Sequence, residues 1–343
     1  MDSFALTFVL CCFNSEKRLP RVLELLALQD FEEPFEVIVV DNRSTDSTRQ
    51  VGTRLTAMLF GKRGRVVSED RPGRMHAILR GISEACGTFV CFVDDDNLLD
   101  RGYARLAVQF LRNHPEVGAV GGESLTPADL SAPDWFASLQ SSYAIGPQGE
   151  REGPVASGRG LWGAGLTVRR QIVSEVLASD WRPTLLGRAG PLPTSGDDSE
   201  LVAIIRLLGW DLWYLPALKL EHAIARERID PQYVVRLFEG FGRAAPIVFE
   251  YHARHQQGNI VRRGLRLLRR LRAVNLLWAT TRYGVARVRS WTAHGPRRVP
   301  ALAHSAYYRG QIEALLHDRP TILQARRNAA ICAALRNGAR GPQ

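Results

Sequence analysis

The sequence predicts an α/β protein with a mixed, mostly parallel sheet flanked by helices, followed by a helical C-terminal extension. Over the first 125 residues, apolar β-branched runs alternate with helical patterns of about 10–15 residues, which is typical of βαβ units. Small polar and acidic clusters follow two of these runs, and ligands of such sheets bind at the carboxyl ends of the strands. From residue 231 onward the pattern is helical.

The individual elements follow from their periodicity. Apolar runs rich in branched residues predict strands at 4–12, 35–40, 65–68, 88–93, 117–121 and 211–215. Apolar residues spaced three and four apart predict helices at 16–29, 45–59, 72–84, 100–113 and 198–208. The stretch 126–196 is rich in Gly, Pro, Ser and Trp and predicts long loops with one short helix near 133–142. Loops of that length in a compact domain are usually functional.

Composition and length restrict the class of protein. The chain has 343 residues, of which 45% are hydrophobic and 23% charged, which excludes wholesale disorder. Five cysteines without a C-x-x-C pair give no sign of a disulfide framework. Neither an uncharged apolar window of about 18 residues nor a signal-peptide pattern is present, so we expect a cytoplasmic protein. We expect a catalytic domain over 1–225 and a basic helical extension over 226–343.

The formal net charge is +10, and the excess is concentrated near the C-terminus. No acidic residue occurs in 259–299, and the helical pattern 260–274 separates an apolar face from Arg262, Arg266, Arg269 and Arg270. A basic amphipathic helix is typical of peripheral contact with an anionic membrane, although packing on its own catalytic domain would give the same pattern. Aromatic residues do not interleave with these arginines, which argues against nucleic acid as partner.

Two acidic clusters follow predicted strands. Asp41 and Asn42 end the second strand, where they could bind a ribose or base or could form a turn that caps the next helix. Asp94, Asp95 and Asp96 end the fourth strand. Three adjacent carboxylates repel one another unless a cation compensates, so they favour a Mg²⁺ or Mn²⁺ ion carrying a diphosphate over a solvated acidic turn.

Five further residues suit the same chemistry. Arg71 and Arg74 stand at a predicted helix start, where they would add positive charge to an anion site or would simply lie on the surface. Asp197 and Asp198 open the helix at 198–208, and a carboxylate at such a junction can serve as a general base or only as a helix cap. His222 follows the last strand, where its imidazole could reach a metal or phosphate or could be structural.

The order and spacing of five motifs resemble the family 2 glycosyltransferases of the GT-A fold over about residues 5–225. The motifs are Cys12-Phe13-Asn14, Val40-Asp41-Asn42 with Ser44-Thr45-Asp46, Phe92-Val93-Asp94-Asp95-Asp96-Asn97, Gly163-Ala164-Gly165 with Arg169-Arg170, and Gly196-Asp197-Asp198 with Glu200-Leu201. The resemblance implies that Asp41 binds the base or ribose, that Asp94 and Asp96 form the Asp-x-Asp pair with Asp96 on the metal, and that Asp198 is the catalytic base.

The residue patterns and the resemblance together define the expected site. Donor contacts are expected from Phe13, Asn14, Asp41, Asn42, Arg71, Arg74, Asp94 and Asp95. Acceptor contacts are expected from Trp162, Gly163, Ala164 and Asp197. Metal contacts are expected from Asp96, Asp94 and His222. Asp197 stands where the family usually has glutamate. The absence of Gln-x-x-Arg-Trp implies a single addition rather than processive synthesis.

The predicted function is inverting, metal-dependent transfer of a sugar from a UDP- or GDP-sugar to a hydroxyl of a glycan or lipid-linked acceptor, with Mn²⁺ or Mg²⁺ as cofactor. A nucleotidyltransferase on a similar sheet is an alternative, but no glycine-rich phosphate loop follows the first strand. A non-catalytic basic module that binds membrane or nucleic acid is the second alternative. No G-x-G-x-x-G follows a strand, which argues against an NAD dehydrogenase.

Overall fold

A computed structural model describes residues 4–128, 130–187, 195–254, 268 and 270–339. Its contacts divide the chain into two compact units. The sheet unit comprises Met1–Leu130, Ser141–Ala178 and Trp210–Ile224, and the helical unit comprises Ser131–Gln140, Ser179–Gly209 and Ala225–Gln343. A functional boundary after residue 225 stays a prediction.

The described part of the sheet unit contains one nine-stranded sheet, ordered β3-β2-β1-β4-β8-β6-β9-β5 with β7 paired to β9. The strands are β1 (Leu6–Cys12), β2 (Phe35–Asp41), β3 (Gly64–Ser68), β4 (Phe89–Asp94), β5 (Asn97–Leu99), β6 (Val117–Leu125), β7 (Gly153–Pro154), β8 (Thr167–Arg169) and β9 (Asp211–His222). The first four strands pair in parallel, as do β6 and β9, whereas β5, β7 and β8 are antiparallel to their neighbours. The predicted mixed, mostly parallel sheet is confirmed.

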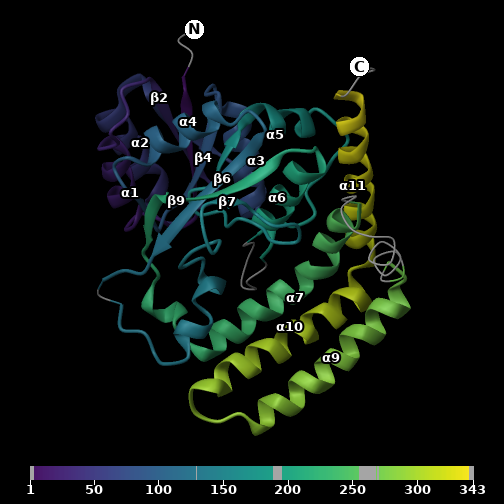
Figure 1. Cartoon of the computed structure of the whole chain (residues 1–343). Helices are drawn as coiled ribbons and strands as arrows, with labels where there is room; N and C mark the ends of the chain where they lie inside the picture. Colours follow the sequence, from purple (N-terminus) through teal and green to yellow (C-terminus); the bar gives the residue numbers. More distant parts are fainter. Residues whose placement is uncertain (1–3, 129, 188–194, 255–267, 269, 340–343) are drawn as a thin grey trace. The chain divides into compact units, whose positions relative to one another are not determined.

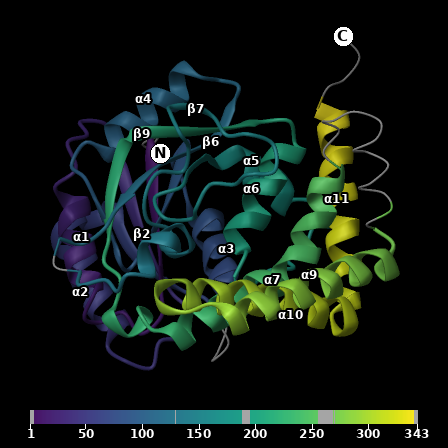
Figure 2. The ribbon, with the colours of Figure 1, turned by 60° about the horizontal axis from the view of Figure 1, so that its bottom comes forward.

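Helices cover both faces of this sheet. They are α1 (Leu19–Ala27), α2 (Thr48–Phe60), α3 (Arg74–Glu84), α4 (Tyr103–Asn113) and α5 (Arg170–Leu177). Leu6, Phe8 and Leu10 point to one face and share a buried core with α1 and α4, and Figures 1 and 2 show α1 and α2 side by side. Val9 points to the other face, where Gly81 of α3 lies against it.

The structure differs from the predicted elements at the last strand. We predicted that this strand ends at residue 215, before Pro216, but β9 continues to His222 and pairs with β5. Proline is tolerated in a sheet where pairing is irregular. The register of β6 against β9 shifts between Gly121 and Glu123, which lie opposite Tyr214 and Lys219, so Pro216 falls within the irregular stretch.

The helical unit is built from α6 (Asp197–Leu207), α7 (Pro231–Arg254), α9 (Arg272–Thr292), α10 (Arg298–His317) and α11 (Arg319–Ala339). Short 3₁₀ turns are η1 (Gly61–Arg63), η2 (Phe136–Ser138), η3 (Gln140–Tyr143), η4 (Arg226–Arg228) and η5 (Gly295–Arg297), of which η2 and η3 stand in place of the helix predicted near 133–142. In Figure 1, α10 lies between α7 and α9.

The crossing of α7 and α10 depends on two glycines. A Cβ atom at Gly242 would overlap the carbonyl oxygen of Tyr307, and one at Gly310 would overlap that of Glu239. The two backbones therefore touch, and only glycine permits this distance. None of the helices in the described part of the chain combines the length and apolar character that crossing a bilayer requires.

A buried carboxylate joins the first turn of α6 to two other helices of its unit. Glu200 is fully buried and accepts hydrogen bonds from the Leu185 N–H (2.8 Å), the Thr184 N–H (3.1 Å) and the hydroxyls of Thr184 and Tyr251. Tyr251 belongs to α7, and its hydroxyl also accepts from the Asn328 side chain of α11 at 3.1 Å. Burial raises the pKa of Glu200, and it raises that of Tyr251 as well.

This burial predicts a pH dependence of stability. The folded protein holds the Glu200 proton more tightly than the unfolded chain, where the pKa is about 4.3. The contribution of Glu200 to the free energy of unfolding therefore falls as pH rises from about 4.3 through the raised folded-state value. Glu200→Gln removes this titration, so the stability difference, wild type minus variant, should decline with pH over that window.

Urea unfolding at a series of pH values measures this difference. Other groups facing Glu200 are the Tyr251 hydroxyl and, from α11, the Cys332 thiol, whose pKa burial raises to about 12. Both pKa values lie above the tested window, so neither group titrates within it. Glu175→Gln on the exposed side of α5 is the matched control and should give a curve parallel to wild type. Parallel curves for Glu200→Gln would contradict the prediction.

Candidate functional site

The ends of three parallel strands meet at one edge of the sheet. In the pairing of β1 with its two neighbours, Cys12 lies opposite Asp41 of β2 and Cys11 lies opposite Asp94 of β4. Neighbouring strands are about 4.8 Å apart, so Asp41 and Asp94 flank the chain where it leaves β1. The structure thus brings together the predicted donor residues that follow these strands, namely Phe13, Asn14, Asp41, Asn42, Asp94 and Asp95.

Asn14 joins the loop after β1 to the loop after β2. Its backbone N–H donates to Ser44 Oγ at 3.1 Å, and its Oδ1 accepts from the Thr45 N–H at 2.8 Å. Asp41 is buried and accepts from the Ser44 N–H at 3.1 Å, so a turn does form, but it does not cap the next helix, since α2 begins at Thr48 after Ser47 without a side-chain cap. Phe13, by contrast, is 59% exposed and presents its ring at this edge.

Asn42 holds the loop that carries the first predicted arginine. Its Nδ2 donates to the carbonyl oxygens of Glu69 (2.9 Å) and Arg71 (2.7 Å), and its Oδ1 accepts from the Gly73 N–H at 3.0 Å. The Arg71 guanidinium makes two 2.9 Å hydrogen bonds to the Glu69 carboxylate. The positive charge of Arg71 is therefore already paired with Glu69. Asn42 positions the loop that carries both residues.

The first two carboxylates of the acidic cluster have separate basic partners. Asp94 Oδ1 accepts from Arg74 Nε at 2.7 Å, and Asp95 Oδ2 accepts from Arg18 Nη2 at 2.6 Å and from the Ser15 hydroxyl. Burial raises the pKa of Asp95, and the hydrogen bonds from Arg18 and Ser15 oppose that rise. Separate pairing is what allows these carboxylates to stand next to each other.

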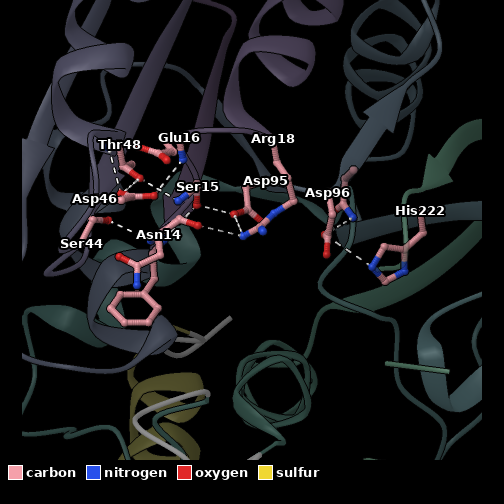
Figure 3. A network of polar contacts seen from close by, with 12 residues as sticks. Asn14, Ser15, Glu16, Arg18, Ser44, Asp46, Thr48, Asp95, Asp96 and His222 are labelled. Carbon is pink, nitrogen blue, oxygen red and sulfur yellow. Dashed lines mark hydrogen bonds and ion pairs between the residues drawn. The ribbon is translucent and has the colours of Figure 1, made fainter. Parts of the chain in front are cut away.

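The third carboxylate turns toward the end of β9. Figure 3 shows Asp95 directed at Arg18 and Asp96 directed at His222. Asp96 Oδ1 and His222 Nε2 are 3.4 Å apart, and both side chains are largely buried. The pairing of Asn97 with His222 across β5 and β9, and a 2.8 Å hydrogen bond from the Ala223 N–H to the Asp96 carbonyl, fix this approach. We predicted that His222 lies just past a strand end. The structure shows instead that it is the last residue of β9.

The donor atoms of this pair suit a divalent ion. Carboxylate oxygen suits Mn²⁺ and Mg²⁺, and neutral imidazole is a common ligand of metal ions. Asp94, the third predicted ligand, is hydrogen-bonded to Arg74 instead. Within the described residues no three histidine, cysteine or acidic side chains gather as a metal cluster, so the structure brings together two of the three predicted ligands.

The predicted acceptor-side loop runs along β4. The Gly165 N–H donates to the Phe92 carbonyl at 3.0 Å, two residues before Asp94, and this holds the buried Gly163 and Ala164 against the strand. The Trp162 N–H donates to Gln148 Oε1 at 2.6 Å. These residues therefore lie within the same unit as the acidic cluster.

Asp197 and Asp198 are the first two residues of α6, after Gly196 in the left-handed region with φ of 104°. Asp197 is buried, and Asp198 Oδ1 accepts from the Ser199 N–H at 2.7 Å. Both belong to the helical unit, whereas the other candidates belong to the sheet unit.

Two contributors to the acidic cluster were missed in the sequence. Arg18 and Ser15 follow β1 and bind Asp95, which is 77 and 80 residues away. The signal available was a basic residue near a predicted helix start, the same signal that drew attention to Arg71. Glu200 stood out in the sequence only as part of a motif. Nothing in the sequence indicated its hydrogen bond with Tyr251, or that of Tyr251 with Asn328.

Comparison with known proteins agrees with this geometry. Residues 7–127 match the family model for glycosyl transferase family 2. Over 104 residues, the chain is 35% identical to poly(ribitol-phosphate) beta-N-acetylglucosaminyltransferase TarS of Staphylococcus aureus, covering 30% of this chain and 18% of TarS. Over 102 residues, it is 37% identical to an uncharacterized glycosyltransferase of Mycobacterium tuberculosis, covering 30% of this chain and 41% of the relative. The chain thus matches less than half the length of either protein.

Structural similarity to known proteins covers more of the chain than sequence similarity does. The mannosyltransferase PcManGT from Pyrobaculum calidifontis, solved with GDP-Man and Mn²⁺, superimposes with a TM-score of 0.54 at 19% identity, over 95% of this chain and 87% of that one. The predicted GT-A fold and the predicted family are confirmed. Residues 7–127 thus match glycosyl transferase family 2, within a chain whose fold is that of the GT-A glycosyltransferases.

Proposed function

We propose that this protein transfers one sugar from a UDP- or GDP-sugar to a hydroxyl of a glycan or lipid-linked acceptor, with inversion and with the help of Mn²⁺ or Mg²⁺. The observation that supports the proposal is the sheet edge where Asp41 and Asp94 lie near the Asp96–His222 pair, with the three aspartates inside the segment that matches the family 2 model. The nucleotide-sugar and metal in PcManGT, and the N-acetylglucosaminyl transfer in the name of TarS, support it.

The donor would lie across the ends of β1, β2 and β4. Asp41 would accept hydrogen bonds from the ribose or base, and the exposed Phe13 ring offers an apolar face beside it. Arg74 would stabilise the diphosphate as negative charge develops on it. Its partner Asp94 holds that guanidinium in place at 2.7 Å.

Asp96 and His222 are the residues that would hold the divalent ion. A bound ion supplies positive charge that stabilises a leaving diphosphate. Both side chains are largely buried and already face each other, so little rearrangement is needed to place two ligands. Arg18 contributes indirectly, because its hydrogen bond turns Asp95 away from this pair.

Asp198 would accept the proton of the acceptor hydroxyl as that oxygen attacks the sugar. With one base and one displacement, the anomeric centre inverts. Trp162, Gly163, Ala164 and Asp197 are proposed to contact the acceptor. We also propose a cytoplasmic protein in peripheral contact with an anionic membrane, but most of the basic segment predicted for that contact, 260–274, lies outside the described residues.

The first prediction concerns the metal. Asp96→Asn and His222→Gln each remove one proposed ligand, so affinity for Mn²⁺ should fall by roughly 10–100-fold, as loss of metal-site contacts commonly causes. Titration of Mn²⁺ by electron paramagnetic resonance, with and without UDP or GDP, measures this directly. Asp100→Asn, an exposed change four residues along, is the control. Nucleotide affinity that is unchanged in excess EDTA would refute the metal requirement.

The second prediction concerns the base. Asp198→Asn keeps the shape of the side chain but cannot accept a proton, so turnover should fall by roughly 100-fold or more while donor affinity persists. Release of nucleoside diphosphate measures turnover, and calorimetry measures donor affinity. Asp180→Asn, on an exposed position of the same unit, should leave both unchanged. If Asp197→Asn abolishes turnover and Asp198→Asn does not, the base is Asp197.

A further inference from the structure

The amphipathic pattern of α9 is reversed. Its buried face consists of small or polar residues, Asn275, Ala279, Ala286 and Ser290. Leu276, Trp278 and Tyr283 are half-buried, but five large apolar side chains are exposed: Val274, Leu277, Val285, Val288 and Trp291. Leu277 is 70% exposed, Val288 54% and Trp291 67%. A helix stabilised only by its own unit would bury such side chains, since each fully buried one contributes about 1.5–3 kcal/mol.

The exposed apolar residues form one stripe. They lie three or eight residues apart along α9, which places them on one side of a helix with 3.6 residues per turn. The buried residues recur on the opposite side, where α10 packs, as Figure 1 shows. Scattered apolar side chains on a surface are ordinary, but an aligned stripe of them marks a surface that meets a partner.

Arginines border this stripe on both sides. With 3.6 residues per turn, Arg282 and Arg289 fall on one border and Arg287 falls on the other. All three are exposed, and the Arg287 guanidinium lies 5.4 Å from the centre of the Trp291 ring. The sequence from 251 to 312 contains 13 arginines and no aspartate or glutamate, so nothing acidic on α9 offsets their charge.

We propose that the exposed face of α9 is a docking surface for an anionic lipid bilayer. The stripe would enter the boundary between headgroups and acyl chains, and the three arginines would bind lipid phosphates while their aliphatic stems cover the stripe. Apart from Val274, the residues of this surface lie outside the basic segment 260–274. The inference rests on the membrane contact proposed above, but not on the proposed sugar transfer.

The charge pattern favours lipid over two other partners. A second copy docked through the same face would bring these arginines toward their own counterparts, without an acidic residue on the helix to pair with them. Nucleic acid would satisfy the arginines but would press Leu277, Val288 and Trp291 against a charged backbone. An anionic bilayer offers phosphates and an apolar layer side by side.

Vesicle flotation tests the proposal with full-length protein. Wild type should float with vesicles of phosphatidylcholine and phosphatidylglycerol and much less with phosphatidylcholine alone. The triple variant Arg282→Gln, Arg287→Gln and Arg289→Gln should lose roughly 100-fold in partitioning, since each basic residue near an anionic surface contributes about fivefold. Arg49→Gln, Arg54→Gln and Arg101→Gln remove equal charge from exposed positions of the sheet unit and should matter much less.

The stripe is tested separately from the charge. Leu277→Asn with Trp291→Ala should reduce flotation, whereas Leu28→Asn with Met58→Asn, two exposed apolar residues elsewhere, should not. Lipids brominated in their acyl chains should quench tryptophan fluorescence in wild type, and Trp291→Phe should abolish most of that quenching.

Three results would overturn the proposal. The first is that the Leu277/Trp291 variant floats like wild type. The second is a dimer in sedimentation velocity that this variant dissociates, which would assign the stripe to a second copy. The third is retention on duplex DNA, lost in the triple arginine variant, without flotation of wild type; this would assign the surface to nucleic acid.

Discussion

The parallel register of β2, β1 and β4 is the constraint on which the candidate site depends. Because Cys12 lies opposite Asp41 and Cys11 opposite Asp94, the chain must leave three neighbouring strands at the same edge. A shift of one residue would turn the buried side chains of β1 to the wrong face, so packing on both faces of the sheet enforces this register. The apolar core thus determines where the polar loops at the strand ends lie.

Each of the three neighbouring carboxylates at that edge has a basic partner of its own. Asp94, Asp95 and Asp96 each face a different basic group, in the order Arg74, Arg18 and His222. Two of these partners are arginines, which stay charged throughout the ordinary pH range. The third is a histidine, which is also a common metal ligand. Asp96 therefore differs from its two neighbours in facing a possible metal ligand, which agrees with the metal-binding role proposed for it.

Local patterns were enough to predict the elements that build the edge, but not the contacts that cross the sheet. The strands and helices up to residue 125 show clear periodicity, and the acidic clusters come directly after strands, so both could be found in the sequence. The short strands β5 and β8 carry too few residues for a pattern, and the irregular pairing near Pro216 hid the second half of β9. His222 was found only as a histidine near a strand. Arg18 could not be matched to Asp95, because 77 residues separate them.

Contacts between residues far apart in the sequence also hold the helical unit together, so local patterns could not predict how α6 is anchored. The helix that begins with Asp197 and Asp198 is joined through Glu200 to Tyr251 of α7, which in turn binds Asn328 of α11. A fully buried carboxylate is tolerated only when its hydrogen bonds are made, and one of those donors comes from a helix more than 50 residues later. The residues 179–209 accordingly cluster with the C-terminal helices rather than with the sheet. An extension that looks separable in the sequence therefore helps to build the helix that carries the proposed catalytic base.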